Sequence, residues 1–327
     1  MTILFIGSEA EDFILTGSWF STTNASRFRS TYTRQAIGVS GGTSFLSLPA
    51  FAAQTTLWFT ARVCFDTSYS ANFNIATFYD GSNIRLRLRV SSTAGTSTLF
   101  VDKFDGSTAT VLGTSTSSLA ATTLYKLDIG ISYANPGYVR VYLDNAIIID
   151  SGSVNVTAGG STSLSGIILG SHYTAGASNW SEVIVANEDT RPLSVKTLVP
   201  NATGDLTGWT AGTWADIDDV TAADVDLAVS DTAAQVLAVN CTGMPTGASN
   251  LSVRAVKSVV LAARGASGPS KIDIGLRQSS TSAFASSQTL DTGYGAFSAT
   301  WTVNPITAAA FTAAEVEAIQ LAYRSAT

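Results

Sequence analysis

Apolar and polar residues alternate with a period of two along much of the chain. In the stretch YVRVYL, Val139 and Val141 alternate with Tyr138, Arg140 and Tyr142. Successive side chains of a β-strand point to opposite faces, so one face of this segment is expected in a core. Similar runs between residues 57 and 185 are TLWFTARVCF, FNIATFYD, IRLRLRV, TLFVDKF, LYKLDIGISY, LSGIILGS and WSEVIVAN. Short strands of this kind, bounded by turn residues, predict an antiparallel β-sandwich.

Turn residues between these runs favour local pairing of neighbouring strands. The segment YDGSN places Asp80 and Gly81 between two strand-like runs, and YANPGYV places residues 135–137 between two others. Asp-Gly and Pro-Gly are typical of tight turns that reverse the chain. Both segments are therefore expected to form antiparallel hairpins.

A domain boundary is predicted in residues 187–205, NEDTRPLSVKTLVPNATGD. Two prolines, Pro192 and Pro200, bracket this connecting segment after the last strand of the first region. Strand-like runs then resume as AAQVLAVNC, NLSVRAVKSVVLAARGA, SKIDIGLRQS and GAFSATWTV. We expect an all-β chain of two β-sandwich (jelly-roll) domains, residues 1–197 and 198–327.

The stretch FTAAEVEAIQLAYR near the C-terminus has a helical pattern. Thr312 is followed three residues later by Glu315, which is the spacing of a capping box. Val316, Ile319 and Tyr323 would fall on one helical face. We expect a C-terminal α-helix that packs on the second sandwich.

Composition excludes some classes of partner. Only 13% of the 327 residues are charged, and the formal net charge is −6. Such a chain has no broad basic field to attract nucleic acid, and a membrane surface is disfavoured for the same reason. The N-terminal segment MTILFIGSEAEDF lacks a basic flank, so neither a signal peptide nor a membrane span is expected. Cys64 and Cys241 lie in apolar runs and are expected to be reduced core thiols.

Patterns of catalytic residues are missing from the sequence. A retaining glycosidase built on a β-sandwich needs acids at period two on one strand, whereas Glu188 and Asp189 are adjacent and would face opposite sides. The single histidine, His172, lies in the loop GSHYTAG, and no Gly-x-Ser-x-Gly elbow accompanies it. We therefore expect a protein without enzymatic activity.

Three arginines form the most distinctive charge pattern. In IRLRLRV, Arg85, Arg87 and Arg89 would share one strand face, where they could pair with carboxylates of a neighbouring subunit or with an anionic glycan. The alternative is a solvated face whose arginines cover apolar neighbours. His172 and Tyr173 are a second candidate contact, in a displayed loop.

Aromatic residues are a further candidate for sugar binding. Tyr133, Tyr138, Tyr173 and Trp180 lie at predicted strand ends or loops, where their rings could stack on a sugar. Packing in the core or at an edge is the alternative for each of them. Their spacing in the sequence does not choose between the two.

A calcium site stays open as an expectation, and no other cofactor is expected. Asp80, Asn83 and Asp144 lie at predicted turns, where carboxylates and carbonyls could supply oxygen ligands. The second domain has a cluster of acids: Asp216, Asp218, Asp219, Asp224 and Asp226. That cluster lacks the glycine and terminal glutamate of an EF-hand loop, so a solvated acidic connector is the alternative.

The first domain resembles a known family of β-sandwiches. The stretch LYKLDIGISYANPGYVRVYLDNAIIIDSG, followed by SGIILGSHYTAGASNWSEVIVANEDTRPLS, resembles the second half of the concanavalin-A-like, laminin-G-like sandwiches. The motifs are V-x-V-Y-x-D at residues 139–144 and W-x-E-V-x-V at residues 180–185. The resemblance covers residues 6–193 and implies a fold more than a function.

The second domain is similar to a module of tailed-phage structural proteins. Its motifs are TGWT at residues 207–210, an acidic run ending in IDD, and the terminal NPIT with FTAAEVEAIQLAYR. The resemblance implies a virion protein for decoration, fibre or tail, homo-oligomeric, with other virion proteins and a host-surface glycan as partners. The alternative is a carbohydrate-binding lectin or a glycan-active enzyme.

Overall fold

The computed structural model describes residues 1–22, 36–65, 73–93, 96–170, 177–218, 226–244 and 251–327. The chain divides into two compact units, Met1–Val195 (unit 1) and Lys196–Thr327 (unit 2). The predicted all-β class is confirmed, because both units consist of antiparallel strands with little helix. The domain boundary expected from the sequence, after residue 197, lies two residues C-terminal to the end of unit 1.

Unit 1 contains thirteen strands and one short 3-10 turn in the described residues. The turn, η1, is Ala10–Asp12. The strands are β1 (Ile3–Gly7), β2 (Ile14–Thr22), β3 (Ala36–Ser47), β4 (Thr56–Phe65), β5 (Phe73–Asp80), β6 (Asn83–Thr93), β7 (Thr96–Asp105), β8 (Thr108–Ser118), β9 (Leu124–Ser132), β10 (Tyr138–Leu143), β11 (Ala146–Asp150), β12 (Gly166–Leu169) and β13 (Ala177–Ala186).

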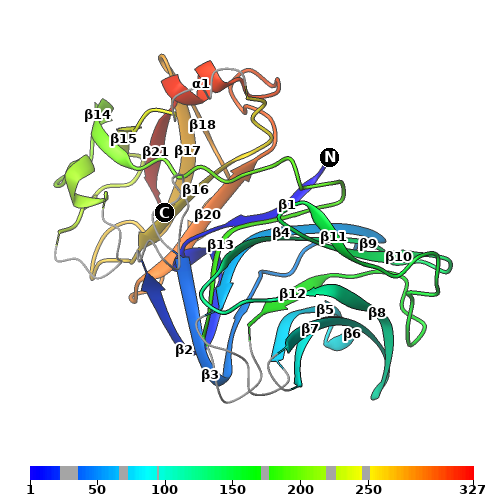
Figure 1. Cartoon of the computed structure of the whole chain (residues 1–327). Helices are drawn as coiled ribbons and strands as arrows, with labels where there is room; N and C mark the ends of the chain where they lie inside the picture. Colours follow the sequence, from blue (N-terminus) through cyan, green and yellow to red (C-terminus); the bar gives the residue numbers. More distant parts are fainter. Residues whose placement is uncertain (23–35, 66–72, 94–95, 171–176, 219–225, 245–250) are drawn as a thin grey trace. The chain divides into compact units, whose positions relative to one another are not determined.

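These strands follow one hydrogen-bonded path that folds into two layers (Figure 1). The order is β11-β10-β9-β4-β13-β3-β12-β5-β6-β7-β8, with β1 beside β13 and β2 beside β3. Strand β3 connects the layers, because it pairs with β13 near its start and with β12 at its end. The two expected hairpins are present as β5–β6 and β9–β10.

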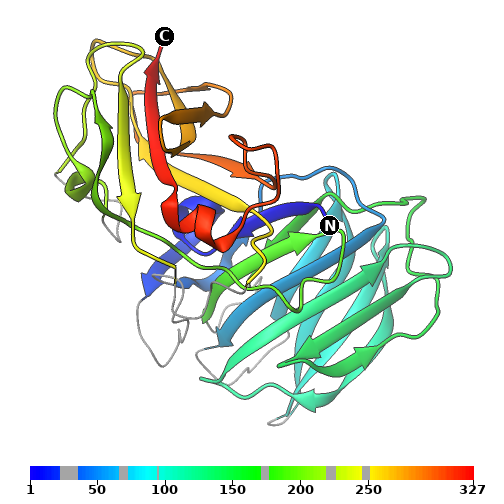
Figure 2. The same cartoon turned by 90° about the horizontal axis from the view of Figure 1, so that it is seen from above.

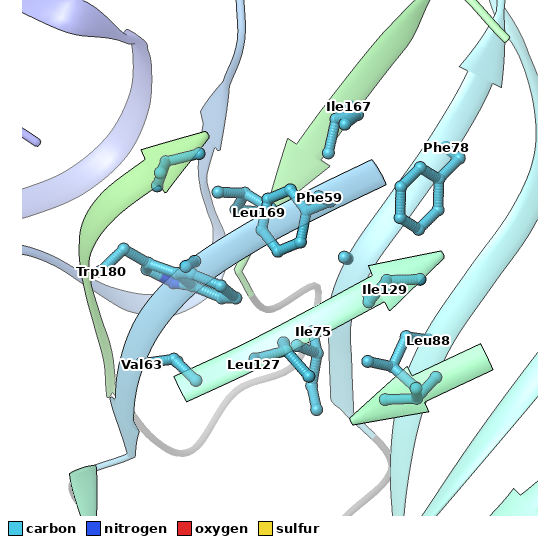
Figure 3. Packing of buried hydrophobic residues seen from close by; sticks show 14 of the residues in the cluster. Phe59, Val63, Ile75, Phe78, Leu88, Leu127, Ile129, Ile167, Leu169 and Trp180 are labelled. Carbon is cyan, nitrogen blue, oxygen red and sulfur yellow. The ribbon is translucent and has the colours of Figure 1, made fainter. Parts of the chain in front are cut away.

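The core of unit 1 lies between the two layers. Figure 3 shows Phe59 and Trp180 from one layer pointing towards Phe78 from the other. The rings of Phe59 and Trp180 meet edge to face at 6.5 Å, and Trp180 is fully buried. Its indole Nε1 donates to Ser178 Oγ at 2.9 Å, so no donor is left unpaired. Each such large side chain stabilises the fold by about 1.5–3 kcal/mol through burial.

Unit 2 is a smaller β-sandwich. Its strands are β14 (Pro200–Thr207), β15 (Val236–Cys241), β16 (Val256–Ala262), β17 (Lys271–Gln278), β18 (Thr281–Phe284), β19 (Gln288–Thr289), β20 (Gly295–Trp301) and β21 (Gln320–Ala326); a 3-10 turn, η2, is Trp214–Asp216. One sheet has the order β14-β15-β21-β17-β18, with β19 on β17, and the other is the pair β16–β20. Buried Leu237, Ile274 and Tyr323 form part of its core.

The C-terminal helix is shorter than its sequence pattern predicts. Helix α1 covers only Ala313–Ala318, and the predicted capping box is confirmed: Glu315 N donates to Thr312 Oγ1 at 3.1 Å. The expectation that Tyr323 continues a helical face is wrong, because Tyr323 lies in β21, shown in red beside β15 in Figure 2. Pairing of β21 with a strand on each side overrides the local helical pattern. Among the described helices, none is long and apolar enough to cross a membrane.

Candidate functional site

Strand β6 positions two of the three candidate arginines on the outer face of its layer. Leu86, Leu88 and Val90 are buried in the core of unit 1. Arg87 and Arg89 alternate with them and therefore point away from the core. Their side chains are 23% and 19% exposed. The strands β7 and β8, which continue this layer, are strongly curved in Figure 1.

Both arginines bind one buried carboxylate. Asp102 on β7 is directly opposite Arg87, and its side chain is 2% exposed. Arg87 donates to Asp102 Oδ2 from Nε at 3.2 Å and from Nη2 at 2.8 Å. Arg89 donates to Oδ2 from Nε at 2.6 Å and to Oδ1 from Nη2 at 3.3 Å. Asp102 thus fixes both guanidinium groups, through charge-assisted hydrogen bonds.

Two phenylalanines of β7 complete this arrangement. The guanidinium carbon of Arg87 lies 4.5 Å from the ring centroid of Phe104, and that of Arg89 lies 4.4 Å from that of Phe100. These distances are typical of cation–π contacts. The five residues Arg87, Arg89, Phe100, Asp102 and Phe104 are called the arginine face below.

The arginine face keeps unused hydrogen-bonding capacity. Each guanidinium has five N–H groups, of which the pairing with Asp102 uses two. Two arginines against one aspartate also leave one net positive charge. The arrangement can therefore donate several hydrogen bonds to an anionic or polyhydroxylated ligand.

Strand β5 extends the polar surface beside the arginine face. Thr77 is directly opposite Arg87, and Asn74 is opposite Arg89, so all four share one side of the layer. Tyr79, two residues after Thr77, lies on the same side because Phe78 between them is in the core. Burial raises the pKa of Tyr79 above the ordinary value of tyrosine, so its phenol stays protonated at neutral pH.

Arg85 does not join this cluster, which corrects the expectation that all three guanidinium groups share one face. Ile84 pairs with Tyr79 and Leu86 with Phe78, so Arg85 is an extra residue in β6 at a β-bulge. Its side chain is 10% exposed, and Nη2 lies 3.7 Å from Asp80 Oδ2. Nη1 packs so closely on Gly159 that a Cβ there would collide with it.

The other candidate residues lie elsewhere. His172 and Tyr173 are outside the described residues, and their role as contacts stays a prediction. Tyr133 and Trp180 are buried in the core, so they cannot form a sugar platform. Tyr138 is half-buried on β10, on the outer side of the opposite layer.

The turn acids that could bind calcium are used in structural contacts. Asp80 lies beside Arg85, and Asp144 Oδ1 accepts from Lys126 N at 2.9 Å. Asp216 Oδ2 accepts from Thr213 in the 3-10 turn of unit 2, at 2.5 Å from the backbone N. Asp219 and Asp224 are outside the described residues. Over the part of the chain that the structure describes, no three His, Cys, Asp or Glu side chains gather as metal ligands.

Sequence reasoning missed the partners of the arginines. Phe100, Asp102 and Phe104 follow each other with period two in TLFVDKF, one turn beyond IRLRLRV. Pairing the two runs as a hairpin brings the acid opposite the arginines. The alternation within each run does not determine that register.

Comparisons with known proteins give matches among solved structures only, and the following three have low identity. No protein-family model and no curated protein matches the chain. An alginate lyase in complex with alginate trisaccharide is similar at 9% identity, over 56% of this chain and 98% of that chain, with a TM-score of 0.41. An endo-β-1,4-glucuronan lyase from Trichoderma reesei shows 11% identity over 57% and 96% of the two chains, with a TM-score of 0.44. A carbohydrate-binding module from Bacillus subtilis shows 14% identity over 54% and 95%, with a TM-score of 0.36.

These proteins are jelly-roll β-sandwiches, consistent with the concanavalin-like fold expected from the sequence. At such identities and TM-scores the likeness concerns the fold alone. The expectation of a protein without enzymatic activity is nevertheless contradicted, because polysaccharide lyases are among the similar structures. The missing glycosidase pattern excluded one mechanism only.

Proposed function

We propose that unit 1 binds an acidic glycan on the arginine face. The observation that carries the proposal is the pair Arg87 and Arg89, fixed by the single buried carboxylate of Asp102 with donors left over. Guanidinium groups match the planar geometry of carboxylates, such as those of uronic acids. The net positive charge of the cluster favours an acidic sugar over a neutral one.

Preorganisation strengthens this reading. A free arginine side chain has about 2 kcal/mol of rotamer entropy, which a ligand must normally overcome when it orders that side chain. Here Asp102 and the rings of Phe100 and Phe104 already hold both guanidinium groups. Binding therefore costs little further ordering of the protein.

The surroundings favour an extended ligand of moderate charge density. The arginine face lies on the outer side of a sheet, where Val111 of β8, opposite Asp102, is 50% exposed. Such an open surface suits a linear chain that lies across several strands. The net charge of −6 opposes nucleic acid, whose charge density is high. We expect an affinity that falls as salt rises.

The test compares acidic and neutral oligosaccharides of the same length, such as oligogalacturonates and malto-oligosaccharides, on the full chain. The informative variant is Arg87→Gln/Arg89→Gln/Asp102→Asn, which removes the charges together and leaves no buried carboxylate unpaired. Arg264→Gln, in an exposed loop of unit 2, is the matched control because it causes the same change in net charge.

We expect the wild type and the control to bind the acidic oligosaccharides, and the triple variant to bind at least about tenfold more weakly, equal to about 1.4 kcal/mol. Equal affinity of the triple variant and the wild type would refute the proposal. The same incubations are assayed for shortening of the oligosaccharides, since a glycan-active enzyme would consume its ligand.

The hypothesis that the chain is a virion protein adds a location and partners to this proposal. It rests on the resemblance of unit 2 to tailed-phage structural modules, at the motifs between residues 207 and 324. A glycan-binding unit on a particle protein would serve adhesion to a host surface. Decoration of a capsid or tail, contacts with other virion proteins and homo-oligomeric assembly stay predictions.

A further inference from the structure

A second candidate site lies on the opposite layer of unit 1, at the β9–β10 hairpin. A hollow of about 210 Å³ is lined there by Ser132, Tyr138, Arg140 and Ser153, and by the backbone at Gly137 and Gly152. Figure 1 shows this end of β9 and β10 at the edge of the unit. The hollow is separate from the arginine face, whose strands belong to the other layer.

The backbone of the hairpin is fixed around the hollow. Gly137 N donates to Val154 O at 2.7 Å, and Val154 N donates back to Gly137 O at 3.0 Å. A Cβ at Gly137 would collide with the carbonyl oxygens of Ser132 and Ala134, so only glycine allows this close approach. The backbone that borders the hollow at Gly137 is therefore held by these contacts.

The charged side chain that lines the hollow, Arg140, is oriented and neutralised by its neighbours. Arg140 Nε donates to Asp150 Oδ2 at 3.2 Å, and its guanidinium carbon lies 4.5 Å from the ring centroid of Tyr138. Gly152 N in turn holds Asp150 Oδ1 at 2.9 Å. The two terminal nitrogens of Arg140 make no hydrogen bond within the described residues, so they stay available as donors.

We propose that this hollow binds one uncharged sugar residue. The Arg140–Asp150 pair has no net charge, which disfavours a free anion or cation. A sugar hydroxyl both donates and accepts, and the hollow offers Arg140 as a donor and the hydroxyls of Ser132 and Ser153 as either. Tyr138 supplies an apolar wall for the C–H face of the ring.

The inference goes beyond the acidic-glycan site, because it names another ligand class on another layer. With both sites occupied, one glycan-binding unit would contact charged and uncharged sugars on opposite faces. The two sites share no residue, so their tests are independent.

The experiment is ligand-detected saturation-transfer NMR on the full chain. The probes are the methyl glycosides of glucose, galactose and mannose, with galacturonate as the charged comparison. Two variants are informative: Tyr138→Ala removes the apolar wall, and Ser153→Trp fills the hollow from an exposed position without removing Arg140 or Tyr138. Tyr294→Ala is the matched control, since Tyr294 is 62% exposed in unit 2.

We expect at least one neutral glycoside to bind wild type, Tyr294→Ala and the arginine-face triple variant equally. Binding should be about tenfold weaker or lost in Tyr138→Ala and Ser153→Trp. Absence of binding by every neutral glycoside, or unchanged binding by Ser153→Trp, would overturn the inference. None of these outcomes bears on acidic-glycan binding, so the two proposals fail separately.

Discussion

Because Asp102 pairs with both Arg87 and Arg89, the stability of variants at these positions can be predicted quantitatively. Arg87→Gln alone leaves the carboxylate paired with Arg89, and Arg89→Gln alone leaves it paired with Arg87. Each single change removes one set of charge-assisted hydrogen bonds. Because both guanidinium groups are about one-fifth exposed, we discount the full value and expect a loss of about 1–1.5 kcal/mol for each.

The double variant Arg87→Gln/Arg89→Gln should cost more than the sum of the single changes. It leaves an ionised carboxylate whose side chain is 2% exposed without any cation beside it. Breaking a buried pair in this way costs about 3–5 kcal/mol. Adding Asp102→Asn removes the uncompensated charge. The triple variant should therefore regain most of the stability that the double variant loses relative to the wild type.

Calorimetric unfolding of the full chain can check this, because the two compact units allow separate transitions. The singles, the double and the triple variant are compared at neutral pH, and only the transition of unit 1 should move. The reasoning is wrong if the double variant loses no more stability than the two single variants together. It is also wrong if the triple variant is no more stable than the double variant, because Asp102 would then not need a cation beside it.

Three further predictions concern other parts of the chain. Burial raises the pKa of Asp128, although the hydrogen bond from Thr60 and the charge of Lys126 oppose the shift. The folded state thus binds this proton more tightly, so the contribution of Asp128 to stability is largest below its unfolded pKa and is lost as pH rises through its folded pKa. Asp128→Asn should therefore raise the free energy of unfolding at neutral pH by about 1–2 kcal/mol, and by less in acid. Urea titrations at the two pH values measure this difference. Thr312→Ala should lower the stability of unit 2 by about 1 kcal/mol through loss of the cap on α1, seen as a lower calorimetric midpoint. Burial raises the pKa of Cys241 to about 12, so iodoacetamide should alkylate it much more slowly in the folded than in the unfolded chain; equal rates would contradict this.

Period-two alternation predicted the class of fold and many individual strands. The pattern around Val139 and Val141 places these residues in the core, as expected. The same rule failed at Arg85, because a β-bulge adds one residue to β6 and moves this side chain away from Arg87 and Arg89. A bulge arises from how two strands pair, and one strand's pattern carries no sign of it.

The C-terminal segment shows a second limit of local pattern. The capping box at Thr312 and Glu315 predicted where the helix begins. Where it ends was predicted wrongly, since Tyr323 fits a helical stripe with Ile319 and also fits a strand in which Leu321 and Tyr323 face a core. The neighbouring strands β15 and β17 decide between the two, and both are distant in sequence.

The candidate site was predicted in part. The arginines were found because three in alternation are unusual, but their shared partner Asp102 was not. Its role depends on the register of β6 against β7, which brings it opposite Arg87. The alternating arginines in the sequence therefore pointed to this strand face. Only the pairing of β6 with β7 showed that Asp102 holds their guanidinium groups in place.

Calorimetric titration of the full chain with an oligogalacturonate, for wild type and Arg87→Gln/Arg89→Gln/Asp102→Asn, tests the central claim most directly. The account predicts saturable binding by the wild type that weakens with added salt, and at least about tenfold weaker binding by the triple variant. Binding of the same strength by the triple variant, or none by the folded wild type at low salt, would contradict acidic-glycan recognition at the arginine face.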